Sequence, residues 1–267
     1  MFVDTHCHLN MFVEKEFNDS LIENDFLAIE QVIIEAKEQR VEKIITVGTS
    51  FIQSQQAIEI AKRFEGVFAA VGLHPCDCTS EWKDDFEQIK KLVKEKEEGK
   101  IVAVGETGLD FFHKPYDKQR QIDAFKAHIE LALQNDLPLV IHVRESADEI
   151  LNVLGEYKND AKGVIHCFMQ SKEIADVFLD WGFYLGINAP ITYPKNEWFR
   201  SLLKEIPMDR ILLETDAPFL PPQQFRGKQN RPAYIPIFAK VLADIKGIDL
   251  PKLEEITTKN AQDLFGI

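Results

Sequence analysis

Two histidines, His6 and His8, stand two residues apart at the end of the first apolar run of the chain. Successive side chains of a β-strand point to opposite faces, so residues i and i+2 share one face. The two imidazoles can therefore point at the same place in space, as ligands of one metal ion must. An H-x-H pair alone is a weak signal, so the rest of the chain has to supply further ligands.

Further candidate ligands each stand at the end of a later strand-like run: His74, Glu106, His142, His166 and Asp216. Of the seven histidines, only His113 and His128 lie elsewhere, and His128 falls in the middle of an expected helix. Each candidate has a structural alternative, since His142 could be a hydrogen-bonded core histidine, Glu106 a turn cap and Asp216 a helix N-cap. These alternatives are independent and would all have to hold at once, so the pattern favours one shared site.

Four imidazoles and two carboxylates suit two divalent cations, for which Mg, Mn and Zn are the candidates. Two ions about 3.5–4 Å apart need a bridging ligand, and a glutamate carboxylate has two oxygens for that purpose. We predict Glu106 as the bridge, with the other ligands divided into His6, His8 and Asp216 on one ion and His142 and His166 on the second. Asp216 would also accept a proton from the attacking water as general base.

Substrate contacts are expected from His74 and from a set of basic residues near the strand ends: Arg144, Arg226, Lys228 and Arg231. His74 would contact a phosphate or the leaving group, because the six predicted ligands already fill two metal sites. Guanidinium forks match the geometry of phosphate. The last three cations lie in a Pro-rich stretch, 217–232, that is long for an ordinary βα loop and is therefore expected to be functional. A solvated loop is the alternative for each of them.

The elements that must position these residues alternate along the chain. Strands are expected at 2–6, 43–48, 67–72, 101–105, 138–143, 163–167, 183–187 and 210–214. Helices are expected near 20–40, 51–64, 83–98, 117–135, 146–157, 171–181 and 196–205, with two more near 233–245 and 251–263. Capping boxes are expected at Ser50–Gln53 and Ser146–Glu149.

Eight strands, each followed by a helix, in about 250 residues predict an α/β fold of the (β/α)8 TIM-barrel type with additional C-terminal helices. In such a barrel, the active site forms at the carboxyl ends of the strands. An open doubly wound sheet is the main competitor, but no G-x-G-x-x-G follows the first strand. We find no linker or repeat and expect a single hydrolase domain over residues 1–267.

Composition restricts the possible functions. The chain has 267 residues, 45% of them hydrophobic, and a formal net charge of -13. An acidic protein is not expected to coat long duplex nucleic acid, although it can still bind one or two phosphates locally. No apolar stretch of about 18 residues is present and no signal peptide precedes Phe2, so we expect a cytoplasmic protein without membrane contact. We expect the four cysteines to be reduced, with Cys7 and Cys167 packed toward the helices, and we see no sign of an obligate protein partner.

With these motifs in place, the sequence resembles the TatD family of metal-dependent deoxyribonucleases, within the amidohydrolase-like barrels. The matching stretches run from residue 3 to the C-terminus: D-T-H-C-H-L at 4–9, G-L-H-P at 72–75, G-E-T-G-L-D-F at 105–111, I-H-V-R-E at 141–145, H-C-F at 166–168, E-T-D-A-P-F-L at 214–220, R-G-K-Q-N-R-P-A at 226–233 and T-T-K-N-A at 257–261. Many ordered motifs make the resemblance specific.

The resemblance implies a TIM barrel that hydrolyses phosphodiester bonds of DNA with divalent metal, often as a 3′-to-5′ exonuclease on single strands or 3′ ends. The family's metal ligands fall on the same six residues that were chosen above. Two stretches depart from the family pattern, Met169-Gln170 and residues 186–190, and both bear on substrate preference rather than on hydrolysis.

Two other functions remain open. A related barrel could deacylate D-aminoacyl-tRNA or hydrolyse another ester or amide. Many amidohydrolase-type barrels bridge their metals with a carbamylated lysine, and Glu106 at the strand 4 position instead favours the nuclease-like branch. A non-enzymatic binding scaffold would be expected to have lost ligands, and none of the six is missing.

Overall fold

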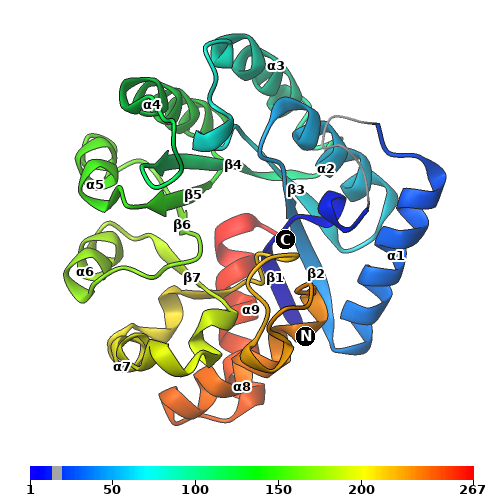
Figure 1. Ribbon diagram of the computed structural model, residues 1–267, viewed down its shortest axis with the longest axis vertical. Coiled ribbons are helices and arrows are strands. Elements are labelled where there is room, and N and C mark those ends of the chain that lie inside the picture. The colour runs from blue at the N-terminus through cyan, green and yellow to red at the C-terminus, as the bar shows by residue number, and fades with distance from the viewer. Residues whose placement is uncertain (14–19) are drawn as a thin grey trace.

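The computed structural model describes residues 1–13 and 20–267, and its centre is one eight-stranded parallel sheet. Each strand pairs in parallel with the next one along the chain (Figure 1). The strands are β1 (Phe2–Cys7), β2 (Val41–Val47), β3 (Val67–Val71), β4 (Ile101–Asp110), β5 (Leu139–Arg144), β6 (Gly163–Ile165), β7 (Tyr184–Ile187) and β8 (Ile211–Leu213).

Backbone hydrogen bonds between the ends of β1 and β8 close the sheet. The Asp216 amide donates to the His6 carbonyl at 2.8 Å, and the His8 amide donates to the Ala217 carbonyl at 2.8 Å. Cys7 and Ala217 form a parallel bridge between these two hydrogen bonds. The predicted (β/α)8 barrel is confirmed.

Helices surround the barrel in chain order, except that the last one crosses its centre (Figure 1). They are α1 (Glu23–Glu38), α2 (Phe51–Arg63), α3 (Trp82–Lys94), α4 (Lys118–Asn135), α5 (Ala147–Gly155), α6 (Lys172–Asp180), α7 (Glu197–Glu205), α8 (Ile235–Lys246) and α9 (Leu250–Phe265). Among the residues described, no helix combines the length and the apolar character that a membrane crossing requires.

The C-terminal helix α9 closes the end of the barrel where the strands begin. Its residues Ala261, Leu264 and Phe265 pack in one cluster with inward-facing strand residues such as Ile45 and Val140. This apolar plug fills the lower barrel, so the polar side chains of the opposite end meet above a closed floor. The additional C-terminal helix was expected from the sequence.

Two β-bulges decide which side chains enter the barrel. The register runs from Asp4↔Ile44 to Cys7↔Thr46 between β1 and β2, so β1 carries one extra residue. The register from Val104↔Leu139 to Thr107↔Ile141 gives β4 an extra residue in the same way. An extra residue exchanges the two faces of a strand beyond it.

The bulges explain why His6 and Glu106 point inward. Val3 and Ala103 belong to the cluster inside the barrel, and strict alternation from them would turn His6 and Glu106 toward the helices. After the bulge in β1, Cys7 instead packs with the apolar residues between the strands and the surrounding helices, such as Ile29 and Ile33, as expected for a packing thiol. Bulges occur often next to active sites because they re-aim a side chain.

Several local predictions were wrong. Glu106 lies inside β4, which continues to Asp110 instead of ending at residue 105. Ser146 stands at the N-cap position of α5, but its side chain makes no capping hydrogen bond and its hydroxyl donates to the Leu109 carbonyl at 2.7 Å. Ser50 does cap α2 by accepting from the Gln53 amide, but the Gln53 side chain accepts a hydrogen bond from Thr49 instead of completing a capping box. Cys167 lies beyond the end of β6, not on the strand.

Candidate metal centre

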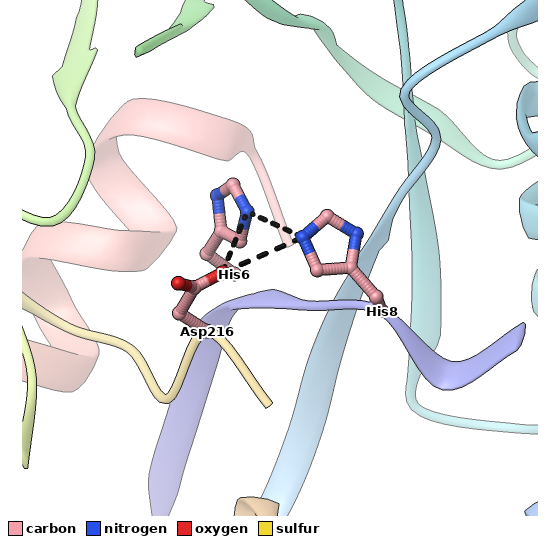
Figure 2. Close-up of side chains that lie close together, drawn as sticks. All are labelled: His6, His8 and Asp216. Atoms are coloured by element: carbon pink, nitrogen blue, oxygen red, sulfur yellow. Dashed lines mark hydrogen bonds and ion pairs between the residues drawn. The ribbon is translucent and has the colours of Figure 1, made fainter. Parts of the chain in front are cut away.

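Four donor atoms converge at the mouth of the barrel, from β1 and the residue after it, from β4 and from the segment after β8. The Nε2 atoms of His6 and His8 lie 3.2 Å apart. Glu106 Oε2 lies 3.4 Å from His6 Nε2 and 3.8 Å from His8 Nε2. Asp216 Oδ1 lies 3.7 Å and 3.5 Å from the same two nitrogens. Figure 2 shows the two imidazoles and the Asp216 carboxylate turned toward one another.

These spacings fit the ligands of one cation. Metal–ligand bonds of about 2.0–2.2 Å in a tetrahedral site place neighbouring donor atoms about 3.3–3.6 Å apart. The five separations above, from 3.2 to 3.8 Å, fall around that value, and most are too long for good hydrogen bonds. Imidazole nitrogen and carboxylate oxygen are also ligand types that bind divalent metals. The residues present therefore fit a metal ion.

The second oxygen of Glu106 faces another group of imidazoles. Glu106 Oε1 lies 2.9 Å from His142 Nδ1 and 3.1 Å from His166 Nε2. His74 Nε2 lies 3.5 Å from the same oxygen. One carboxylate thus separates two sets of donors, which is the geometry expected of a bridging ligand.

Hydrogen bonds of the outer ring nitrogens fix which nitrogen is free to bind a cation. His8 Nδ1 lies 2.8 Å from the Val47 carbonyl, to which it can only donate, so Nε2 keeps its lone pair toward the centre. His142 Nε2 lies 3.0 Å from Asp110 Oδ2 and donates to that carboxylate. The His142 nitrogen that faces Glu106, Nδ1, can then act as the ligand.

His74 turns its protonated nitrogen toward the centre, unlike His8 and His142. Its Nδ1 accepts a hydrogen bond from the Cys76 amide at 3.1 Å, and burial lowers the pKa of His74 to about 3. A neutral imidazole that accepts at Nδ1 carries its proton on Nε2, the nitrogen that faces Glu106. His74 is therefore placed as a hydrogen-bond donor at the mouth rather than as a metal ligand.

The sequence did not predict two buried carboxylates, Asp110 and Glu214, that contact the ring nitrogens of His142 and His166 turned away from Glu106. Asp110 accepts hydrogen bonds from the imidazoles of both His142 and His113, so His113 also belongs to the site's surroundings. Glu214 Oε1 lies 3.4 Å from His166 Nδ1 and accepts a hydrogen bond from the Cys167 amide. Both carboxylates lie in motifs noted in the sequence, G-E-T-G-L-D-F and E-T-D-A-P-F-L, which were the available signals.

Two glycines make room for these contacts. Gly108 has φ +139°, and a Cβ there would lie 2.1 Å from the His142 carbonyl oxygen. A Cβ on Gly186 would lie 2.3 Å from Glu214 Oε2. Gly186 thus provides the space that the Glu214 side chain occupies.

The buried acids stay ionised because imidazoles surround them. Burial alone would raise the pKa of Glu106, but His166, His74 and His142 hold it well below its usual range. Burial likewise acts to raise the pKa of Asp216, and His8 lowers it below the ordinary value. Both carboxylates therefore carry negative charge at neutral pH, as metal ligands must.

A cavity of about 420 Å³ opens above these residues and contains part of the predicted substrate set. It is lined by His8, Met11, Thr49, His74, Asp77, Glu106, Asp110, His113, His142, Arg144, His166, Asp216, Phe219 and Leu220. Arg144 and His74 thus line the cavity. This volume lies within the range of about 300–1,000 Å³ found for small-molecule sites.

The other three predicted cations have partners outside the cavity lining. Arg231 forms an ion pair with Glu35 of α1. The guanidinium of Arg226 lies 4.8 Å from the ring centre of Tyr193, and Lys228 Nζ lies 6.0 Å from that of Phe225. The structure therefore does not bring these three side chains together with the centre.

The sequence and the fold are similar to those of known proteins. Residues 3–266 match the family model described as TatD related DNase. The chain is 36% identical to the uncharacterized metal-dependent hydrolase YabD of Bacillus subtilis over the full length of both chains. It is 34% identical to the 3′-5′ ssDNA/RNA exonuclease TatD of Klebsiella pneumoniae, over 89% of this chain and 92% of that one.

A solved structure shares the whole fold. The TatD homologue YjjV of Escherichia coli superposes with a TM-score of 0.89 at 29% identity, covering 100% of this chain and 98% of that one. Fold and sequence thus agree on the same group of metal-dependent hydrolases.

Proposed function

This chain belongs to the family of TatD related DNases, and on that premise we propose that it removes nucleotides from the 3′ ends of single-stranded DNA by phosphodiester hydrolysis. The observation that carries the proposal is the position of Glu106, whose two oxygens face two separate sets of donors. The relative named as a 3′-5′ ssDNA/RNA exonuclease supports the choice of substrate.

We assign the metal ligands as the sequence predicted them. His6, His8 and Asp216 would hold one divalent cation, with Glu106 shared between the two. The second cation would lie between Glu106 Oε1 and the imidazoles of His142 and His166. Mg, Mn and Zn are the candidate ions, and bound there they would lower the pKa of a water molecule and neutralise charge on phosphoryl oxygens.

The chain's own residues then orient the reaction. The water oxygen forms a bond to phosphorus, the bond from phosphorus to the 3′ oxygen of the preceding nucleotide breaks, and that oxygen takes a proton from solvent and leaves as the new 3′-hydroxyl. Asp216, ionised and at the edge of the cavity, accepts the proton of the attacking water. The Nε2–H of His74 donates a hydrogen bond to a phosphoryl oxygen, and the Arg144 guanidinium neutralises the strand backbone.

The test is digestion of single-stranded DNA labelled at its 3′ or 5′ end, with and without divalent metal, beside a D-aminoacyl-tRNA hydrolysis assay. We expect metal-dependent release of mononucleotides from the 3′ end. Hydrolysis of the aminoacyl ester without DNA cleavage would refute the nuclease and favour the deacylase. Mononucleotides released from the 5′ end would contradict the proposed polarity.

Glu106→Ala tests the bridging assignment. It should lower turnover by more than about 100-fold, because loss of a residue that only hydrogen-bonds a metal ligand already costs about 10- to 100-fold. Glu97→Ala, on the exposed stretch after α3, is the matched control and should keep wild-type activity. A Glu106→Ala protein with normal turnover and metal content would refute the bridge.

A further inference from the structure

Phe219 is an exposed aromatic side chain beside the candidate metal centre. It is 50% exposed, although phenylalanine is among the residue types most often buried. Its ring centre lies 6.1 Å from that of His8, at an interplanar angle of 68°. The ring is therefore within about one nucleotide's reach of the atoms that would surround the scissile phosphate.

The backbone around Phe219 is held in a fixed position. The Phe219 amide donates to the Asp216 carbonyl at 2.8 Å, closing a tight turn directly after a predicted ligand. The buried side chain of Asn230 donates to the Thr215 carbonyl at 2.8 Å, and its backbone amide donates to the Pro218 carbonyl at 2.9 Å. Asn230 thus bonds to the residue before the turn and to Pro218 within it, so these hydrogen bonds fix the backbone that carries the ring.

The cavity lining contains both apolar and cationic side chains. Met11, Phe219 and Leu220 supply apolar side chains next to His8 and Asp216. Arg144 lines the same cavity, with its guanidinium 4.4 Å from the ring centre of Phe112. A nucleotide can use both kinds of side chain, since it has a flat apolar base at one end and an anionic phosphodiester at the other.

We propose that Phe219 is the stacking platform for the base of the 3′-terminal nucleotide, with Met11 and Leu220 as the apolar walls of the base subsite. This assignment rests on the proposed function. Stacking on an aromatic ring tolerates every base, because each base has a π-face, so the subsite would hold the strand end without sequence preference. Phe219 would act as a substrate-positioning residue that places the terminal phosphodiester over the centre.

The test compares two single strands that differ only in the terminal base. One ends in a natural nucleotide and the other in an abasic nucleotide with the same phosphodiester. Phe219→Ala should lower kcat/KM on the natural strand by about 5- to 150-fold, the range that loss of one base–aromatic stack produces. On the abasic strand the same substitution should change kcat/KM less than about twofold, because no base is left to stack.

Further variants separate stacking from folding. Phe219→Leu keeps apolar bulk without the flat ring and should lose activity like Phe219→Ala, whereas Phe219→Trp should retain it. Trp198→Ala removes an equally exposed aromatic residue on α7, outside the cavity lining, and should leave both rates unchanged. A strand with a 3′-terminal 2-aminopurine and a non-cleavable methylphosphonate linkage gives a second readout, since stacking on Phe219 should quench its fluorescence.

The outcomes decide between the two proposals. Equal loss of kcat/KM on the natural and abasic strands, or no loss on either, would overturn the base subsite while leaving the nuclease intact. A wild-type protein that degrades neither strand would overturn the proposed function and this inference together.

Discussion

Asp110→Asn should weaken metal binding although Asp110 is not among the predicted ligands. The Asp110 Oδ2 atom accepts hydrogen bonds from His142 Nε2 at 3.0 Å and from His113 Nδ1 at 2.8 Å. The Oδ1 atom accepts from the amides of Phe112 and His113, both at 2.9 Å. An asparagine can keep the contacts of Oδ1 with the backbone, but its NH₂ group would face two imidazole N–H groups.

The magnitude follows from the bond that is lost. Hydrogen bonds to a charged acceptor contribute about 1.5–3 kcal/mol, which converts to about 10- to 150-fold in an equilibrium constant. Loss of a carboxylate behind a metal-bound histidine weakens metal affinity or activity by about 10- to 100-fold. The two ranges agree, so we expect Asp110→Asn to raise the dissociation constant for metal by about 10- to 100-fold.

The assay is competition with a chromophoric chelator for Mn²⁺ or Zn²⁺, followed by turnover at saturating metal. His113→Ala is the matched control, because it removes the other imidazole from the same oxygen while the His113 side chain is 56% exposed. This variant should bind metal within about threefold of the wild type, as most exposed polar contacts contribute little. Wild-type affinity in Asp110→Asn, or an equal loss in His113→Ala, would refute the orienting role of Asp110.

Three further predictions concern other parts of the chain. Burial lowers the pKa of His128 from 6.5 to about 4, so its contribution to stability is complete above pH 6.5 and is lost toward pH 4. That loss amounts to about 3 kcal/mol. The His128→Gln side chain can still accept from the Leu73 amide but does not titrate, so its free energy of unfolding, measured by urea titration, should change little between pH 6.5 and pH 4. Arg144→Gln should raise KM for single-stranded DNA by about tenfold or more, because Arg144 lines the cavity. Arg231 is already paired with Glu35, so Arg231→Gln should change KM less than about twofold. Steady-state kinetics that show the reverse order would refute a DNA contact of Arg144. When free metal is present at about 100 times its dissociation constant, removing it with a chelator should lower the free energy of unfolding by about 2.7 kcal/mol. Calorimetry should show this as a drop in Tm of about 5–10 °C.

The sequence predicted the barrel and its candidate ligands because both follow from position along strands. Parallel strands end at one face of a barrel, so polar residues such as His142, His166 and Asp216 had to meet once the strands were located. No spacing along the chain could reveal the bulges in β1 and β4, since a bulge is a relation between two paired strands. The inward direction of Glu106 therefore depends on its register with β5, which only the folded chain shows.

The long loop after β8 was harder to interpret for a different reason. A cation in a loop is free to point toward the substrate or toward a neighbouring element, and its sequence position does not decide between them. Arg231 pairs with Glu35 of α1, which is distant in sequence. Phe219, in the same loop, stands in the apolar run Ala217–Leu220, where a phenylalanine is typical of a core residue, yet the turn that Asn230 holds leaves it half exposed at the cavity.

In the stretch from Glu106 to Asp110, strand register, a glycine and two acidic residues together hold the His142 ring in place. Gly108 pairs with His142 across β4 and β5, and residues two positions on either side of it share its face. Glu106 and Asp110 therefore reach the His142 ring from opposite sides, at 2.9 Å and 3.0 Å. A side chain at position 108 would collide with the His142 backbone between them, so the glycine is required by the same contact that the two carboxylates make. The Asp110 carboxylate fixes the tautomer of His142, and the Glu106 carboxylate lies with His142 Nδ1 where a cation would bind.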